Sequence, residues 1–234
     1  MRLPALLAVV LLSSLASTAS AQYSDEYDRY SPTREWLSLS LGVGTYRPNV
    51  GSDVFRDVFG KDKGPLLTGG IDFRLFRLGD FAAFTVGAYQ SWARYEARAC
   101  AFDEGVVDCD NRASERTMLR IFPLSVLAGL NIDVLARKFR VPFYFVGRIG
   151  LDSVFYGTRT GGERDAAGTS IGLRWEAEVD LELDFLERRA QRTLDDEWGI
   201  NHTYLLFKIY GSTAQSMLPV GTKIAWVAGL GFVF

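Results

Sequence analysis

The sequence predicts an all-β fold, a closed up-and-down antiparallel eight-stranded transmembrane β-barrel. Eight segments alternate apolar and polar residues with a period of two, the pattern of strands whose two faces meet different environments. All but one of these segments are nine or more residues long, which is enough to cross a bilayer at a tilt of about 45°. No run of eighteen apolar residues follows residue 21, so the sequence beyond that point predicts no membrane-spanning helix.

Each predicted strand runs from the first to the last residue of its alternating segment. In the sixth segment the apolar face runs from Ile171 to Leu183, and the other face carries a ladder of acidic residues. An even number of strands lets an up-and-down sheet close on itself. The eight predicted segments are residues 35–44, 66–75, 84–89, 122–130, 143–152, 170–184, 200–209 and 226–234.

The connections fall into two sets, one at each end of the predicted barrel. Outer-membrane barrels have short turns on the periplasmic side and long loops outside. We expect Gly-rich and charged extracellular loops at 47–65, 98–114, 158–168 and 211–221, and periplasmic connections at 79–80, 132–140 and 185–199. Aromatic residues at strand ends are typical of interfacial girdles, although core or loop packing explains one or two of them equally well: Trp36, Trp92, Trp198 and Tyr46.

The N-terminus has the pattern of a secretory signal peptide at residues 1–21. A basic start at Arg2 precedes an apolar stretch, and Ala19, Ser20 and Ala21 provide the small residues of a cleavage site. Residues 22–33 are then expected to form an N-terminal periplasmic segment, and residues 34–234 the barrel domain.

Composition excludes several classes of partner and site. The formal net charge of the 234 residues is -2, and no basic stripe indicates nucleic-acid binding. Cys100 and Cys109 are the two cysteines, which predicts a disulfide in an exported chain. Closing so short a loop contributes about 2–3 kcal/mol in the chain-entropy model. Because two cysteines without a nearby histidine make half a ligand set, we expect no metal there, and no cofactor is predicted.

The polar face of the strands is predicted to line the lumen. An eight-stranded barrel has an interior just wide enough to be filled by side chains, which suits glycines and compensating charges. Like charges along the sixth segment would repel one another unless cations on other strands were near them. We therefore expect a salt-bridged plug that conducts little, made by Asp72, Arg74, Arg148, Asp152, Arg174, Glu176, Glu178, Asp180, Glu182 and Lys208.

The last nine residues, WVAGLGFVF, alternate as a strand and end in an aromatic residue. This ending resembles the C-terminal signal of Gram-negative outer-membrane proteins, with Leu230, Phe232 and Phe234 at the matching spacing. The layout as a whole resembles small barrels of the OmpA transmembrane domain, OmpX and OmpW type, with no motif that selects a subfamily. The resemblance implies insertion into the outer-membrane bilayer by the barrel-assembly machinery, and pairing of the last strand with the first.

The function expected from these features is structural, or a surface interaction made by the extracellular loops with a partner that the sequence does not identify. Three alternatives stay open: a porin-like or OmpW-like channel for small molecules, a soluble lipocalin-like binding barrel with the apolar face inside, and an enzyme. His202 is the single histidine. It is expected to be a rim residue bonded to a turn, because no nucleophile–base pair is evident and no catalytic residue is predicted.

Overall fold

The protein is described here by a computed structural model. The structure describes residues 35–50, 55–56, 59–60, 62–103, 106–184, 186, 194–195, 197–216 and 218–234. The predicted signal peptide at 1–21 and the periplasmic segment at 22–33 lie outside the described residues, so both stay predictions.

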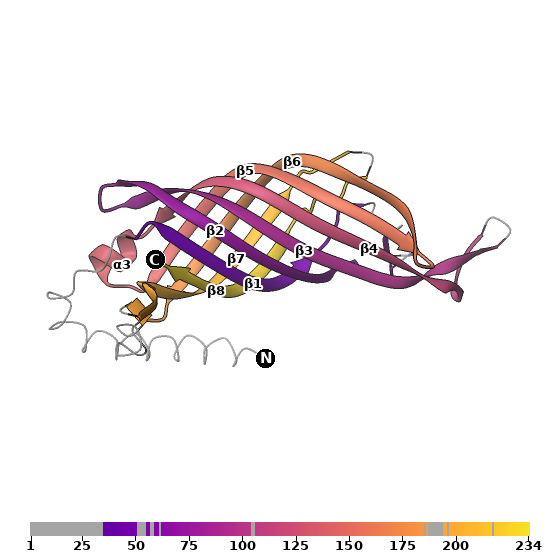
Figure 1. The fold of residues 1–234 in the computed structure, drawn as a ribbon, viewed down its shortest axis with the longest axis horizontal. Helices are drawn as coiled ribbons and strands as arrows, with labels where there is room; N and C mark the ends of the chain where they lie inside the picture. Colours follow the sequence, from indigo (N-terminus) through magenta and orange to yellow (C-terminus); the bar gives the residue numbers. More distant parts are fainter. Residues whose placement is uncertain are drawn as a thin grey trace, which may run out of the picture.

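Eight antiparallel strands form one closed barrel in sequence order (Figure 1). The last strand pairs with the first, with Leu41 opposite Leu230, which leaves no sheet edge within the ring. The predicted closed eight-stranded barrel is therefore confirmed. The elements are β1 (Leu37–Tyr46), β2 (Gly64–Leu78), β3 (Ala82–Asp103), β4 (Val106–Ile132), α3 (Val134–Phe139), β5 (Phe143–Thr160), β6 (Glu163–Glu182), β7 (His202–Ser212) and β8 (Ala225–Val233).

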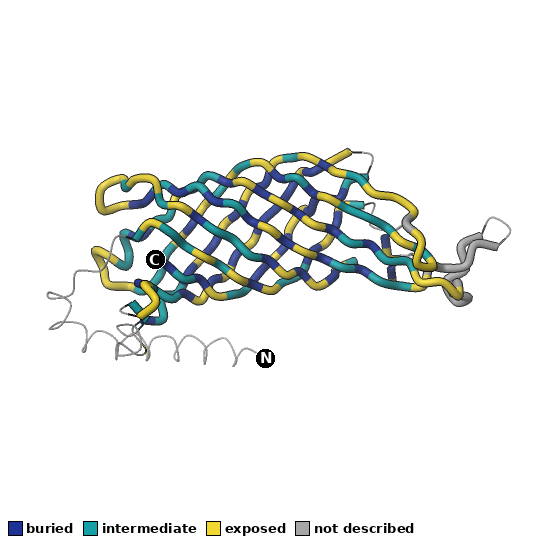
Figure 2. The backbone as a smooth tube through the Cα atoms, viewed as in Figure 1, coloured by how far each residue is buried: buried dark blue, intermediate teal, exposed yellow. Residues whose placement is uncertain are grey.

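The barrel has an apolar exterior and a charged interior. Leu41, Ile149 and Ile171 are each more than 60% exposed, whereas Arg174 and Lys208 are almost completely buried. Exposed and buried positions alternate along the strands (Figure 2). A soluble lipocalin-like barrel has the reverse arrangement, so the described strands exclude that alternative. A belt of apolar side chains around a closed barrel requires lipid, and in bacteria such barrels occupy the outer membrane.

The lumen contains two layers, which differs from the polar interior that the sequence predicts. At the end far from the C-terminus, the lumen is filled by apolar and aromatic side chains. Phe55 and Phe59, from the β1–β2 connection, pack on Tyr95, and the ring centroids of Phe55 and Tyr95 are 5.0 Å apart. We call this cluster, which includes Tyr46, Leu66, Tyr95 and Tyr210, the apolar plug. The charged layer lies between the apolar plug and the end of the barrel that holds the C-terminus. The connection itself supplies part of the core, a possibility that period-two patterning cannot indicate.

Two connections predicted as extracellular loops are largely strands. In place of a loop at 158–168, β5 and β6 continue to a tight turn at Gly161 and Gly162, both of which have positive φ. In place of a loop at 98–114, β3 and β4 continue as a two-stranded ribbon that projects beyond the barrel (Figure 1). We call residues 94–103 and 106–116 the β3–β4 arm.

The opposite end carries the connections that the sequence predicts to be periplasmic, and it is called the periplasmic end below. A turn at Gly79 (φ 58°) joins β2 and β3 as predicted. The predicted connection at 132–140 includes α3, which ends at Arg140 in the left-handed conformation. The long connection at 185–199 is described only at 186, 194–195 and 197–199. Within the described part of the chain, no helix is both long and apolar enough to span a membrane.

A charged residue placed on the outer face tests whether this face of the barrel contacts lipid. Ile149 is exposed on the middle of β5, and Val141 is exposed just before β5 at the periplasmic end. We expect Ile149→Arg to lower the free energy of unfolding from lipid vesicles by about 2–4 kcal/mol, and Val141→Arg by about 0–1 kcal/mol, because the cost of burying charge in lipid depends on depth. Free energies of unfolding are measured by reversible urea unfolding followed by tryptophan fluorescence. Equal effects of the two substitutions would contradict the placement of Ile149 deep in the lipid and Val141 near its surface.

Candidate functional site

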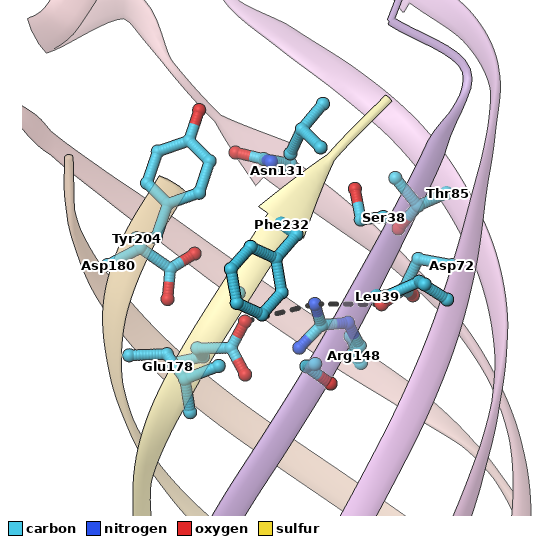
Figure 3. Close-up of a pocket in the computed structure, with 14 residues that line it drawn as sticks. Ser38, Leu39, Asp72, Thr85, Asn131, Arg148, Glu178, Asp180, Tyr204 and Phe232 are labelled. Carbon is cyan, nitrogen blue, oxygen red and sulfur yellow. Dashed lines mark hydrogen bonds and ion pairs between the residues drawn. The ribbon is translucent and has the colours of Figure 1, made fainter. Parts of the chain in front are cut away.

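The charged layer of the lumen is centred on Arg148, which lies on β5 with its side chain 7% exposed. Its guanidinium nitrogens lie 2.7 Å from Glu176 Oε1, 3.1 Å from Glu178 Oε1 and 3.4 Å from Asp72 Oδ2. Figure 3 shows Arg148 between Glu178 of β6 and Asp72 of β2. One cation thus joins carboxylates from two strands that are not neighbours in the barrel, which a planar five-donor group can do.

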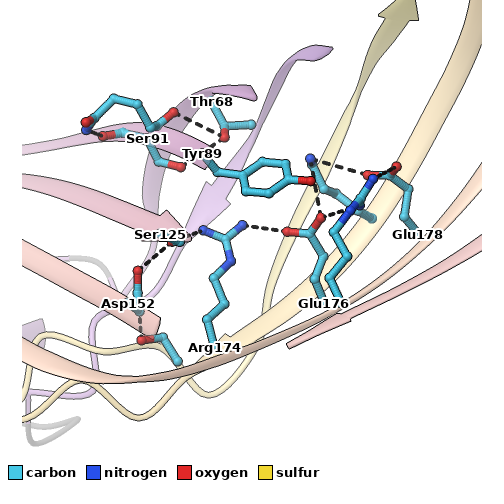
Figure 4. A network of polar contacts seen from close by, with 12 residues as sticks. Thr68, Tyr89, Ser91, Ser125, Asp152, Arg174, Glu176 and Glu178 are labelled. Carbon is cyan, nitrogen blue, oxygen red and sulfur yellow. Dashed lines mark hydrogen bonds and ion pairs between the residues drawn. The ribbon is translucent and has the colours of Figure 1, made fainter. Parts of the chain in front are cut away.

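Arg174 extends the contacts of Arg148 toward the apolar plug. Its Nη2 lies 2.7 Å from Glu176 Oε2, and its Nη1 donates to Ser125 Oγ at 3.0 Å. Ser125 in turn donates to Asp152 Oδ1 at 2.6 Å, and Ser212 donates to the other oxygen of Asp152. Figure 4 shows this chain of contacts from Glu176 to Asp152. Asp152, which forms no ion pair with a described cation, is thereby satisfied by two hydroxyl groups.

Tyr89 and Lys208 complete this lumen network. Lys208 Nζ lies 3.3 Å from Glu178 Oε2, and the Tyr89 hydroxyl donates to Asp72. The Tyr89 ring faces cations, with Arg148 Cζ 5.3 Å and Lys208 Nζ 5.1 Å from its centroid. A Cβ atom at Gly87 would lie 2.3 Å from Asp72 Oδ1, so this glycine leaves room for the carboxylate.

The structure brings most of the predicted lumen residues together but not all of them. Arg74 and Glu182 lie instead at the periplasmic rim, and Asp180 faces the lumen beside the network without an ion pair to a described cation. Sequence reasoning missed Tyr89, Ser125 and Ser212. The period-two pattern places a hydroxyl group on the inner face of a strand, but it does not indicate which side chains of other strands that group contacts. The residues in contact through this network are Asp72, Arg148, Asp152, Arg174, Glu176, Glu178 and Lys208.

A second polar cluster lies at the periplasmic rim around His202. Its Nδ1 is 2.5 Å from Asp184 Oδ2 and 3.6 Å from Glu182 Oε1. Its Nε2 is 3.5 Å from Glu35 Oε1, and Glu35 also pairs with Arg74. One ligand atom from each of Glu182, Asp184 and His202 lies within 4.8 Å of the others, so these three could ligate a metal ion. His202 is thus the rim residue that the sequence predicts, bonded to Asp184, two residues beyond the end of β6.

The environment of Glu35 shifts its titration. Burial favours the neutral carboxylic acid, but the hydrogen bond with His202 and the charge of Arg74 outweigh burial and hold the pKa of Glu35 well below its usual range. Folding therefore gains stability from ionised Glu35 above the pKa of the unfolded state, and this gain is lost as pH falls toward the lower pKa of the folded state.

The C-terminal residues of the predicted assembly signal lie on the last strand. Leu230 and Phe232 sit opposite Leu41 and Leu39 of β1, and the Phe234 carbonyl oxygen accepts hydrogen bonds from the backbone N–H groups at 36 and 37. The residues of the predicted signal thus lie where β8 pairs with β1 and closes the barrel. Its reading by the assembly machinery stays a prediction.

The predicted girdle residues separate into two groups. Trp36 and Trp198 are exposed just before β1 and β7, as in an interfacial girdle. Trp92 is also exposed, but it lies in the middle of β3 and not at its end, because β3 continues to Asp103; it is level with Leu67 near the start of β2. Tyr46 is fully buried in the lumen, and its hydroxyl donates to the Val220 carbonyl oxygen at 2.7 Å. Tyr46 therefore belongs to the apolar plug, which was one of the two possibilities left open by the sequence.

The predicted disulfide lies in the β3–β4 arm. The backbone of Cys100 is opposite Arg112, next to a register shift. The side chains of Cys100 and Cys109 lie outside the described residues, so the disulfide stays a prediction.

Removing Arg148 tests the lumen network. We expect Arg148→Met to lower the free energy of unfolding by about 3–5 kcal/mol, because buried carboxylates lose their shared cation. Arg94→Met is the matched control, since Arg94 lies 41% exposed on the arm and pairs there with Glu96. The control is expected to leave stability nearly unchanged. Equal midpoints for Arg148→Met and wild type in urea would show that the network does not stabilise the fold.

The rim cluster predicts a stability change with pH. Below about pH 4.3, the usual Glu pKa, Glu35 is protonated in the unfolded chain while it stays ionised in the folded barrel, so wild type loses this stabilisation on acidification. We expect Glu35→Gln to be less stable than wild type at pH 7 and to lose less stability between pH 7 and pH 3. The control is Glu163→Gln at the exposed β5–β6 turn, which should follow wild type. Parallel curves for Glu35→Gln and wild type would refute the prediction.

Comparison with known proteins yields solved structures of similar outline. No protein-family model matches the chain, and no curated protein matches its sequence. Ail, the attachment invasion locus protein of Yersinia pestis, in complex with the heparin analogue sucrose octasulfate, is 11% identical, with 86% of this chain and 100% of Ail covered and a TM-score of 0.48. A second Ail structure is 14% identical over the same shares, with a TM-score of 0.43. Neisserial surface protein A is 10% identical over 85% of this chain and 94% of its own, with a TM-score of 0.41. A likeness of this degree assigns no ligand, partner or function.

Proposed function

We propose that this outer-membrane barrel has a closed, side-chain-filled lumen and acts at the cell surface through the β3–β4 arm, where it binds an extended segment of a partner by strand addition. The observation that carries this proposal is the length of the arm. It continues beyond the strands on either side of it, so both of its outer edges lack a neighbour among the described strands.

The register shows where the neighbouring strands stop. Pairing of β3 with β2 ends at Ala93 opposite Leu66, and pairing of β4 with β5 ends at Thr117 opposite Thr160. The arm itself continues to Asp103 opposite Val106. Apart from the Arg116 carbonyl oxygen, which accepts from the Gly161 N–H at 3.3 Å, the backbone groups on its outer edges pair with no described strand, and such an edge is a template for another strand.

Charged side chains at the base of the arm limit which strands can pair there. Glu96 lies 2.7 Å from Arg94 and 3.2 Å from Arg116. Charges beside a free edge are a device by which native sheets suppress unspecific pairing. We therefore expect a selective partner, and a disulfide between Cys100 and Cys109 would stiffen the arm before binding.

The lumen offers little support for the channel alternative. Arg174, Lys208 and Tyr210 are almost completely buried inside the barrel, and Arg174 Cζ lies 3.7 Å from the centroid of the Tyr210 ring. Stacked side chains fill the cross-section at this level, as expected for eight strands.

We also propose that the protein is not an enzyme. Both ring nitrogens of His202 face carboxylates, and among the described residues no hydroxyl nucleophile is bonded to the ring. The partners proposed are the outer-membrane bilayer, the barrel-assembly machinery and an extracellular polypeptide. Nucleic acid and cofactors are not among them.

Trimming the arm tests the proposed function. Replacing residues 99–115 by Asn-Gly joins Arg98 to Arg116, which already face each other in the register, through a two-residue hairpin turn. We expect the trimmed barrel to reach the outer membrane, to keep its gel mobility shift on heating, and to lose binding of intact cells to one another and to arrays of immobilised extracellular proteins.

The control changes the neighbouring turn, Gly161–Gly162, to Asn-Gly and should bind like wild type. Unchanged binding by the trimmed barrel would remove the arm as the site of interaction.

A further inference from the structure

Arginine side chains gather on the outer wall of the barrel, at the end that carries the β3–β4 arm. Arg120 of β4 faces outward like the exposed Phe122, because Ile121 between them is fully buried in the lumen. Arg120 and Arg159 of β5 line the same open hollow in this wall, and the volume of the hollow is about 250 Å³. Neither the lumen network nor the role proposed for the arm uses these two cations.

The strand register brings a third arginine to this cluster. Arg94 of β3 is directly opposite Arg120, and Arg159 is opposite Met118, which lies two residues nearer the arm on β4. Arg120 Nε donates to Met118 Sδ at 3.2 Å, a weak acceptor that leaves the charge of the guanidinium unpaired. Like charges directly opposite each other destabilise a sheet, and an anion bound between them relieves this repulsion.

Glu96 provides a carboxylate beside these arginines, but other cations engage it. It lies 2.7 Å from Arg94 and 3.2 Å from Arg116. Within the part of the chain that the structure describes, Arg120 and Arg159 form no ion pair with a carboxylate. Four arginines and one glutamate therefore leave an excess of positive charge on this part of the outer wall.

The depth of the cluster follows from the apolar residues of β5. Its outward apolar side chains extend from Phe145 to Phe155, both of which are more than 40% exposed. About ten residues of strand, at ~3.3 Å each and a tilt of ~40°, rise by about 25 Å, the height of the lipid-facing band in such barrels. Arg159 lies four residues beyond Phe155, and Arg120 lies two residues beyond Phe122, which is opposite Phe155. With the arm outside the cell, as proposed above, both cations are level with the headgroups of the outer leaflet.

We propose that Arg120, Arg159 and Arg94 bind the headgroup of an outer-leaflet lipid that carries phosphomonoester groups. The planar donor fork of arginine matches the oxygens of phosphate. An excess of several positive charges suits a headgroup with more than one negative charge better than it suits a phosphodiester, which has a single charge. The bound phosphates offset the repulsion between the arginines that face each other across β3 and β4.

Apolar surface beside the cations accommodates the acyl chains of the same lipid. Phe122 and Phe155 line the hollow that Arg120 and Arg159 share. A second open hollow, of about 400 Å³, lies on the β2 side of Arg94, and its outward-facing apolar residues are Val43, Leu67 and Trp92. A cation beside an apolar hollow is complementary to an amphiphile with an anionic head. A free phosphate ion would leave this apolar surface without a ligand.

Lipid binding to the purified barrel tests the site. Delipidated protein in nonionic detergent is titrated with bisphosphorylated lipid A, or with the same lipid after removal of both phosphates, and bound lipid is counted by native mass spectrometry. We expect wild type to bind the phosphorylated form preferentially and NaCl to weaken this preference by screening. Millimolar inorganic phosphate should not displace the lipid.

Matched variants locate the site on the outer wall. We expect the double variant Arg120→Gln, Arg159→Gln to bind bisphosphorylated lipid A about 30-fold more weakly than wild type, the loss for two arginines at an anionic lipid surface. Arg47→Gln is the control, because Arg47 is also exposed at this end but pairs with Asp62 at 3.2 Å, and it should bind like wild type. The heat-induced gel shift shows which variants fold. If the double variant does not, Arg159→Gln alone carries the test, with an expected loss of about 5-fold.

The trimmed barrel separates this site from the role proposed for the arm. Replacing residues 99–115 keeps Arg94, Arg120 and Arg159, so we expect the trimmed barrel to bind the phosphorylated lipid like wild type. Loss of partner binding without loss of lipid binding, or the reverse, then shows which of the two proposals fails.

Three results would overturn the lipid site. One is equal binding of the phosphorylated and dephosphorylated lipids by wild type. Another is a loss of binding in Arg47→Gln as large as in the double variant, which would indicate diffuse charge. The third is displacement of the lipid by millimolar inorganic phosphate, which would indicate a site for free anions.

Discussion

Closure of the backbone ring is the constraint on which the rest of this structure depends. In hydrocarbon no water is available to backbone N–H and C=O groups, so every strand needs a partner on both sides. The pairing of β1 with β8 meets this need, and the Phe234 carbonyl accepts from backbone N–H groups at the start of β1. Once the ring is closed, alternate residues on each strand must face either lipid or lumen, and this separates the apolar belt from the charged interior.

A lumen of eight strands is narrow, and its contents must pack and pair like a protein core. The outer layer does so with aromatic and aliphatic side chains, including Phe55 and Phe59 from outside the strands. The inner layer does so with charges, in which Arg148 and Arg174 share Glu176. Such buried ion pairs are kept only where each charge has a partner. At Asp180 this internal pairing is incomplete, because one of its carboxylate oxygens has no hydrogen-bond partner among the described residues.

Outside the bilayer the need for closure ends, because water satisfies backbone groups there. The β3–β4 arm uses this freedom, since its two strands pair with each other while their outer edges stay free. The closed ring and the open edges of the arm thus follow from the same requirement, that backbone polar groups be hydrogen-bonded. In lipid only strand pairing meets it, whereas outside the bilayer water does. The surface role proposed for the arm and the stabilising role expected of the lumen network are accordingly independent of each other.

The sequence by itself determined the number of strands, their approximate positions and their apolar face, because alternation with a period of two is a local property. It also indicated that the polar face would carry compensating charges. Only the tertiary structure decided which of these charges meet: Arg74 and Glu182 lie at the rim and not in the network, because strand tilt and stagger set depth. It also decided that residues 98–114 and 158–168 are mainly strands, although their glycines and charges are typical of loops. Contacts such as Arg148 of β5 with Asp72 of β2 cross the lumen between residues whose alternation pattern carries no information about each other.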